Sequence, residues 1–272
     1  MGGSPSSGGM DGHGGTGASG GAEAEGGTGA QGGTGAQAGG APQGGDGPAL
    51  GGAAGMVAAA GRAGAAGSPE VPKGCTSALM VDDMEDGDQL TCASQGRSGD
   101  WWTAIGATSA TIDPPSNEDF PAFALGAESR SGSNYGMHLA GAGFGRTDDD
   151  WASLGFFVAG GDAYSLSTSQ GLAFYAKASV ALTIRVTFAT ATTTPTSEGG
   201  DCADDCNDHY ALAAALTTSW KEFTIPFDAL AQEGWGEKPK DLAHTLFIYF
   251  GYVGPDGGPT TFDFLIDDVR LY

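Results

Sequence analysis

Residues 260–272 read TTFDFLIDDVRLY, a run rich in aromatic and β-branched residues that predicts a long strand. Two adjacent carboxylates, Asp267 and Asp268, follow Ile266 in this run. Successive side chains of a strand point to opposite faces of its sheet. We therefore expect Asp267 and Asp268 to point to opposite faces, so that only one of the two shares a site with other residues.

An acidic segment at residues 80–86, MVDDMED, is the expected partner of that strand. If the first and last strands pair, Asp83 or Glu85 lies near Asp267 or Asp268. Calcium takes six to eight oxygen ligands from carboxylates and carbonyls. Two interpretations stay open: a structural calcium site that joins the two ends of the domain, or acids that cap turns and remain solvated.

The first 70 residues differ from the rest of the chain. They hold 27 of the 50 glycines and no Phe, Trp or Tyr. Such a segment cannot bury enough apolar surface to offset its conformational entropy, so we expect disorder. The repeat GGTGAQ at residues 26–31 and 32–37 is typical of a flexible tether. We place a tether at residues 1–73 and one folded domain at residues 74–272.

The charge excludes some partners. The net charge is −22, and the first 70 residues contribute −4 (five acids, one base), which leaves −18 for the rest. Such a surface opposes nucleic acid and anionic lipid, because phosphate binding needs clustered Lys and Arg. Neutral ligands and cations remain compatible. No run of 18 apolar residues occurs, so we expect no transmembrane segment.

The four cysteines are Cys75, Cys92, Cys202 and Cys206. Close pairs in a β-rich chain suggest disulfides and an oxidising compartment. Sequential pairing is the simplest of three connectivities, and zinc is the rival interpretation, although no CxxC spacing supports it. The chain begins MGGSPSSGGMDG, which has no signal-peptide pattern. We hypothesise an export signal, of the lipoprotein or another type, upstream of this start.

Short β-type segments separated by Gly, Pro, Asp and Ser predict an antiparallel sandwich. The ten expected strands are residues 78–82, 101–105, 135–140, 152–158, 171–177, 180–189, 210–214, 219–226, 245–252 and 260–271. In the sixth strand, alternation predicts that Val180, Leu182, Ile184, Val186 and Phe188 face the core. Arg185 then lies on the outer face. Residues 227–232 predict one helical turn capped by Asp228.

Candidate ligand-binding residues lie in two segments. The loop DCADDCNDHY at residues 201–210 places Asp208 and His209 at a strand entrance, where they suit hydrogen bonding to sugar hydroxyls or merely solubilise the loop. In the pair Trp101–Trp102, one indole fills the core and the other stacks on a ligand or covers an edge. His138 falls inside an alternating strand and is interpreted as structural. No HExxH, GxSxG or P-loop motif is present, so we expect no enzyme.

Residues from about 75 to 272 resemble the galactose-binding-like jelly-roll carbohydrate-binding modules, above all family 11 and family 30-like modules. The resemblance lies in the order and spacing of seven motifs: MVDDMEDGD, GRSGDWW, SRSGSNYGMHL, GLAFYAKAS, CNDHYALAAALTTSWKEFTIPFDAL, EGWG and FLIDDVRLY. It implies a two-sheet β-sandwich with a structural calcium near the paired termini. The implied calcium ligands are Glu85, with Asp83 as competitor, Asp267, and carbonyls of residues 131–134.

The resemblance also implies a glycan on an open sheet face. The matching positions are Trp101 or Trp102, Arg185, Asp208 and His209. The leading hypothesis is a non-catalytic, monomeric carbohydrate-binding domain of an extracellular or surface-tethered bacterial protein. Two alternatives remain: a structural or adhesive surface lipoprotein with no sugar site, and a polysaccharide-active enzyme.

Overall fold

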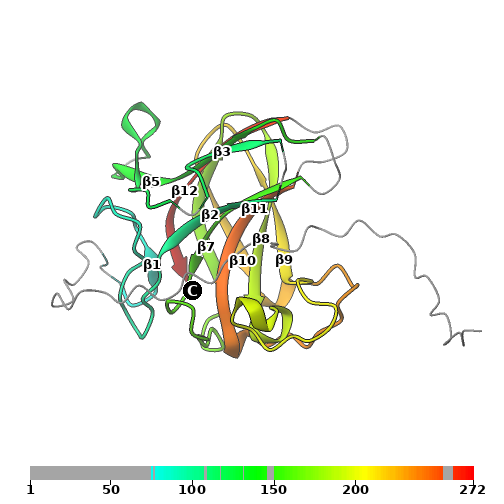
Figure 1. Cartoon of the computed structure of the whole chain (residues 1–272). Coiled ribbons are helices and arrows are strands. Elements are labelled where there is room, and N and C mark those ends of the chain that lie inside the picture. Colours follow the sequence, from blue (N-terminus) through cyan, green and yellow to red (C-terminus); the bar gives the residue numbers. More distant parts are fainter. Residues whose placement is uncertain are drawn as a thin grey trace, which may run out of the picture. The chain divides into compact units, whose positions relative to one another are not determined.

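Two antiparallel sheets account for nearly all of the regular structure (Figure 1). The computed structural model describes residues 75, 77–106, 109–116, 118–130, 132–145, 150–253 and 260–272. The tether expected at residues 1–73 lies outside this part of the chain. The all-β sandwich expected from the sequence is confirmed.

The seven-stranded sheet has the order β10-β7-β12-β5-β3, with β1 beside β12 and β4 beside β5. Its strands are β1 (Met80–Asp82), β3 (Thr111–Asp113), β4 (Phe123–Ala124), β5 (Tyr135–Ala142), β7 (Gly171–Ala178), β10 (Lys221–Pro226) and β12 (Thr261–Leu271). The last strand therefore lies near the middle of its sheet, between β7 and β5. As expected, it also pairs with β1.

The five-stranded sheet has the order β2-β6-β11-β8-β9. Its strands are β2 (Trp101–Ile105), β6 (Trp151–Phe157), β8 (Leu182–Thr190), β9 (Tyr210–Leu216) and β11 (Thr245–Val253). All ten expected strands have a counterpart in the two sheets, whereas β3 and β4 were not expected. The helices of the described residues are single 3-10 turns: η1 (Gly126–Glu128), η2 (Ala191–Thr193), η3 (Thr196–Glu198), η4 (Phe227–Ala229) and η5 (Leu242–His244).

One apolar core is shared by both sheets. The ring of Phe174 on β7 meets that of Phe250 on β11 at a centroid distance of 4.9 Å. Burying one such side chain stabilises the fold by about 1.5–3 kcal/mol. The indole of Trp101 on β2 also lies in this core, and its Nε1 donates to Asp82 Oδ2 on β1 at 2.7 Å. This bond joins the two sheets.

The alternation expected around Arg185 holds for four of five residues. Leu182, Ile184, Val186 and Phe188 are buried. Val180 is 48% exposed, so the expectation that it faces the core is wrong. The reason is that β8 begins at Leu182 and Val180 lies in the preceding turn.

The helical turn expected at residues 227–232 is shorter and differently capped. It is the 3-10 turn η4, whose N-cap is Pro226 and which has no side-chain capping bond. Asp228 lies inside the turn, so the expectation that it caps the turn is wrong. Proline fixes the backbone before the turn instead.

A β-bulge breaks the alternation of β12. Asp268 has a φ of +48°, and the pairing with β7 shifts register between Asp267 and Arg270. Ile266 and Val269, three residues apart, are both fully buried in the core. The extra residue of the bulge makes this possible, since two residues of the bulged strand then oppose one of its partner. The expectation that Asp267 and Asp268 point to opposite faces is therefore wrong.

Both sequential disulfides are present, Cys75–Cys92 and Cys202–Cys206. They account for all four cysteines of the chain, and zinc has no thiolate left to bind. Among the described residues, no helix combines the length and the apolar character that crossing a membrane requires.

Candidate functional site

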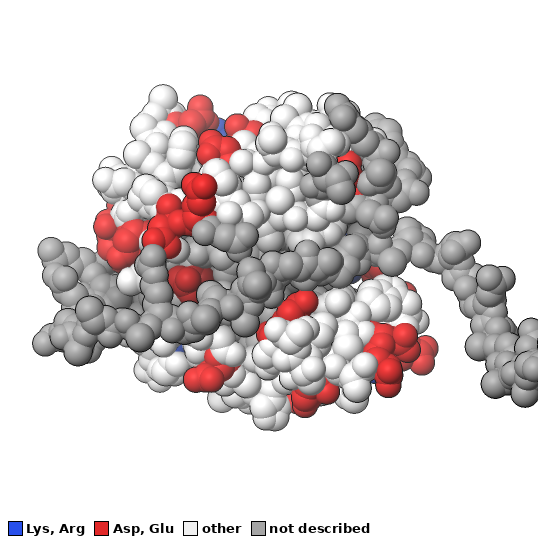
Figure 2. All heavy atoms as spheres, in the orientation of Figure 1, with Lys and Arg blue, Asp and Glu red and all other residues white. Residues whose placement is uncertain are grey.

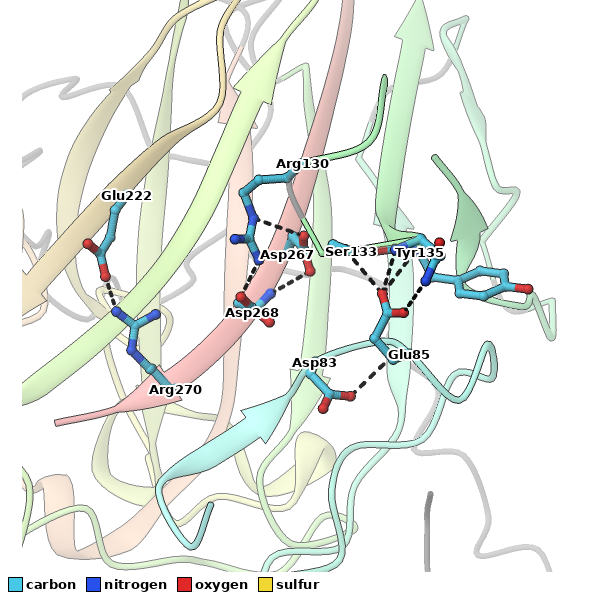
Figure 3. A network of polar contacts seen from close by, with 10 residues as sticks. Asp83, Glu85, Arg130, Ser133, Tyr135, Glu222, Asp267, Asp268 and Arg270 are labelled. Carbon is cyan, nitrogen blue, oxygen red and sulfur yellow. Dashed lines mark hydrogen bonds and ion pairs between the residues drawn. The ribbon is translucent and has the colours of Figure 1, made fainter. Parts of the chain in front are cut away.

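The acidic residues at the paired ends of the domain are engaged with donors of this same chain (Figure 3). Glu85 Oε1 accepts bonds from the backbone N–H of Asn134 (2.7 Å) and Tyr135 (3.2 Å) and from Ser133 Oγ (3.1 Å). Its Oε2 accepts from Asn134 Nδ2 at 2.8 Å. Burial tends to raise the pKa of Glu85, but these hydrogen bonds outweigh it and lower the pKa. Glu85 therefore fastens the opening segment to the start of β5.

Asp267 and Asp268 share one arginine. Arg130 Nε lies 3.3 Å from Asp267 Oδ2, and the same guanidinium forms an ion pair with Asp268 (Figure 3). The side chain of Asp267 is fully buried, and burial raises its pKa to about 6, against the effect of Arg130. Arg130 lies within the SRSGSNYGMHL motif, yet sequence reasoning did not single it out. Only the bulge of β12 brings both carboxylates within its reach.

In this structure the carboxylates expected to hold calcium bond to groups of the chain itself. No group of three or more His, Cys, Asp or Glu in the described part of the chain could hold a metal. The oxygens of Glu85 face N–H and O–H donors, and Asp267 faces a guanidinium. Asp83 Oδ1 accepts the backbone N–H of Glu85 at 3.2 Å. Ser131, whose carbonyl belongs to the implied shell, lies outside the described residues. Calcium stays a prediction.

The two tryptophans divide as expected between the core and the outer face. Trp101 is 1% exposed. Trp102 lies on the outer face of the five-stranded sheet, against Gly155, where a Cβ atom would lie 2.4 Å from the indole. Its neighbours are the rings of Phe247 and Tyr249 at about 6 Å. The side chain of Trp102 is therefore partly accessible to a ligand, whereas that of Trp101 is not.

Arg185 also lies on this outer face. It forms an ion pair with Glu233, and the two side chains are 27% and 30% exposed. The carboxylate of Asp208 is buried and accepts three backbone N–H bonds, from Glu233 at 2.8 Å and from Gly234 and Gly236 at 2.9 Å. Asp208 thus organises the loop that carries Glu233.

His209 is buried as well. Its Nδ1 lies 2.7 Å from Thr193 Oγ1, and burial lowers its pKa to about 4. The imidazole therefore stays neutral and holds the loop that contains η2. Of the five residues expected to contact a sugar, only Trp102 and Arg185 keep exposed surface on this sheet.

A pocket of about 370 Å³ lies on the outer face of the other, seven-stranded sheet. On β12, Leu265 pairs with Lys177 of β7 on one side and with His138 of β5 on the other. The outward side chains of three neighbouring strands therefore meet here. The lining residues are Phe123, Glu128, His138, Lys177, Ala178, Ser179, Thr218, Asp263 and Leu265.

The polar groups of this pocket are held in pairs. His138 Nε2 lies 3.1 Å from Asp263 Oδ1, and Lys177 forms an ion pair with Glu128. The ring of Phe123, 42% exposed, lies 4.6 Å from the imidazole of His138. Sequence reasoning interpreted His138 as structural and did not predict this pocket, although a histidine in the outward phase of an alternating strand was the available signal.

Among solved structures, the chain is similar to a family 11 carbohydrate-binding module from Clostridium thermocellum in complex with a β-1,3-1,4-mixed-linked tetrasaccharide. The identity is 19%, the TM-score 0.46, and 71% of this chain and 94% of that chain are covered. A family 30 module of a cellulosomal cellulase from Clostridium thermocellum has 12% identity, a TM-score of 0.46 and coverages of 71% and 96%.

A third structure, TmCBM61 in complex with β-1,4-galactotriose, has 12% identity, a TM-score of 0.32 and coverages of 63% and 87%. No protein-family model matches the chain, and no curated protein matches it. The likeness is therefore to β-sandwich carbohydrate-binding modules, at identities below 25% and TM-scores below 0.5. The function proposed below rests on the side chains of this chain.

Proposed function

We propose that this domain binds carbohydrate without catalysing a reaction, and that the pocket on the seven-stranded sheet is its binding site. The observation that supports this proposal is the His138–Asp263 pair beside the exposed ring of Phe123. A sugar hydroxyl needs a donor and an acceptor side by side, which a histidine and a carboxylate supply together. The C–H face of the sugar ring packs on an aromatic ring.

The pocket is ordered before a ligand arrives. Asp263 orients His138, and Glu128 orients Lys177. Three of these four side chains stand on strands, which place polar groups more precisely than loops do. Each hydrogen bond to a sugar nets only about 0.5–1.5 kcal/mol, so affinity for a short oligosaccharide is modest.

The opposite sheet supports a second location for the same function. There the indole of Trp102 packs against Gly155, and Arg185 is partly exposed. A partly exposed indole suits stacking against a sugar ring. In this arrangement Trp102 would stack on the sugar and Arg185 would bond to its hydroxyls.

We also propose that the domain is exported from the cytoplasm. Two disulfides are typical of extracellular, periplasmic and surface proteins, because the cytosol keeps thiols reduced. We place the domain outside the cytoplasm, as a monomer, with a polysaccharide as its partner.

A glycan array followed by titration calorimetry tests the proposal. The pocket variants are Phe123→Ala and His138→Ala, and the variants of the opposite sheet are Trp102→Ala and Arg185→Ala. Loss of binding in the pocket variants alone supports the proposed site. Loss in the Trp102 and Arg185 variants alone moves the site to the five-stranded sheet. A folded domain that binds no plant, bacterial or fungal glycan overturns the function and favours a structural or adhesive role.

A further inference from the structure

The charged groups of the pocket are not equally accessible. The side chains of Glu128 and Asp263 are 55% and 49% exposed. Those of Lys177 and His138 are 16% and 14% exposed. An entering ligand therefore meets the carboxylates first, because the side chains of Lys177 and His138 lie deeper in the pocket.

The negative charges of Glu128 and Asp263 are also only partly neutralised by neighbouring cations. Lys177 is paired with Glu128, whereas the partner of Asp263 is an imidazole, which is not a permanent cation. Glu128, Asp263 and Lys177 together carry a formal charge of −1, within a part of the chain whose net charge is −18. Figure 2 shows many Asp and Glu atoms and few Lys or Arg atoms on the visible face. Such a field raises the local concentration of cations and repels anions.

These charges distinguish between classes of sugar. Uronic acids and sulfated sugars bring a negative charge against Asp263 and Glu128, which costs free energy. A neutral sugar meets the same carboxylates only through hydroxyl groups. A protonated amino sugar presents an ammonium group with N–H donors and no acceptor, which matches an exposed carboxylate. The ring of Phe123 beside His138 adds an attractive face for a cation.

We infer that the glycan bound in this pocket contains unacetylated amino sugars, whose ammonium groups are recognised by Asp263 and Glu128. This inference rests on the proposed function and names the substrate class of the same site. It predicts that acidic polysaccharides bind poorly to this pocket. It also predicts that neutral glycans bind with lower affinity than glycans of amino sugars.

Calorimetry with matched oligosaccharides tests this inference. The probes are a glucosamine hexasaccharide and its fully N-acetylated form, because acetylation removes the positive charge and keeps the backbone. Wild-type protein is expected to bind the glucosamine form more tightly, and the advantage should shrink as salt is added. Asp263→Asn and Glu128→Gln should each reduce this advantage roughly twofold to fivefold, as for partly exposed ion pairs.

The control is Asp228→Asn, which changes the net charge by the same amount on an exposed residue of η4 that does not line the pocket. It should leave the ratio of the two affinities unchanged. Equal binding of both oligosaccharides by the wild type overturns the inference, as does an equal loss of the advantage in all three variants. Binding of neutral glycans alone also overturns it and leaves the proposed function standing. If no glycan binds at all, the proposed function itself fails.

Discussion

The guanidinium of Arg130 lies 4.0 Å from the ring centre of Tyr175 on β7. The same group bonds to the two aspartates of the bulge on β12. Arg130 therefore links the loop before β5 to two strands of the seven-stranded sheet. A planar guanidinium can stack on a ring and bond to carboxylates at the same time, which a lysine ammonium cannot do.

Replacing Arg130 with alanine should lower the free energy of unfolding by about 2–3 kcal/mol, because Asp267 would remain buried without a cation. This is less than for a fully buried pair, since the Arg130 side chain is 19% exposed. Denaturant titration measures the change, and Arg130→Lys should recover part of it. The matched control, Arg270→Ala, breaks the more exposed pair with Glu222 and should cost less than about 1 kcal/mol. Equal costs for the two alanine variants would contradict this role of Arg130.

Chelation tests whether calcium takes part in the same region. Since the carboxylate of Glu85 accepts bonds from loop donors and that of Asp267 faces Arg130, we expect the melting temperature to be the same in excess chelator and in added calcium. A ligand that binds only the folded state would raise it. A melting temperature that falls on chelation and returns with calcium would show that the ion competes successfully with Arg130.

The stability of the domain should fall as the pH rises from 6.5 to 8. Burial raises the pKa of Asp82 to about 8, against 3.8 for an ordinary aspartate. Its contribution to stability is thus fully present below pH 4 and is lost as the pH rises through 8. Asp267 has a pKa of about 6 and His209 a pKa of about 4. Most of the pH dependence that these two groups give to the free energy of unfolding therefore lies below pH 6.5.

Urea titrations at several pH values check this expectation. The titration of one carboxyl group changes the free energy of unfolding by at most about 1.4 kcal/mol per pH unit. Asp82→Asn removes the titration, so its stability should change less between pH 6.5 and 8 than that of the wild type. At pH 6.5 the variant is expected to be less stable, because Trp101 Nε1 and the Met84 N–H donate to the two oxygens of the carboxyl group, whereas asparagine offers a single acceptor. Parallel pH profiles for the two proteins would exclude Asp82 as the cause.

Gly155→Ala should destabilise the domain by about 1–3 kcal/mol, because the added methyl group meets the indole of Trp102 at 2.4 Å. Tryptophan fluorescence should shift as the indole is displaced. Gly251→Ala is the matched control on the neighbouring strand, where the nearest atom to a Cβ, on Tyr249, is 3.4 Å away. It should cost clearly less. Similar costs for both variants would show that Trp102 is not held against Gly155.

Much of the fold could be predicted from local patterns. Turn residues separated short apolar runs, and ten runs became strands. The bulge of β12 was also visible in principle, because buried residues alternate through Phe262, Phe264 and Ile266 and then skip to Val269. A change of spacing from two to three residues predicts an extra residue in the strand. A strict alternation therefore gave the wrong face for Asp268.

The pocket could not be predicted in this way. His138, Leu265 and Lys177 become neighbours only because β5 and β7 pair with opposite edges of β12, and local periodicity does not say which strands pair. Asp208 and His209 show the converse. Polar residues in a loop suggest ligand binding, yet a buried carboxylate serves equally well as the acceptor for backbone N–H groups of a neighbouring loop.

The Cys75–Cys92 disulfide determines how the domain bears mechanical load. A force applied through the residues before Cys75 passes across the disulfide to Cys92 and bypasses the intervening segment, which includes β1. The short pairing of β1 with β12 therefore carries no tension, and the carboxylates of residues 82–86 keep their contacts under pull. If this one bond were reduced, the force would act first on the three-residue strand β1.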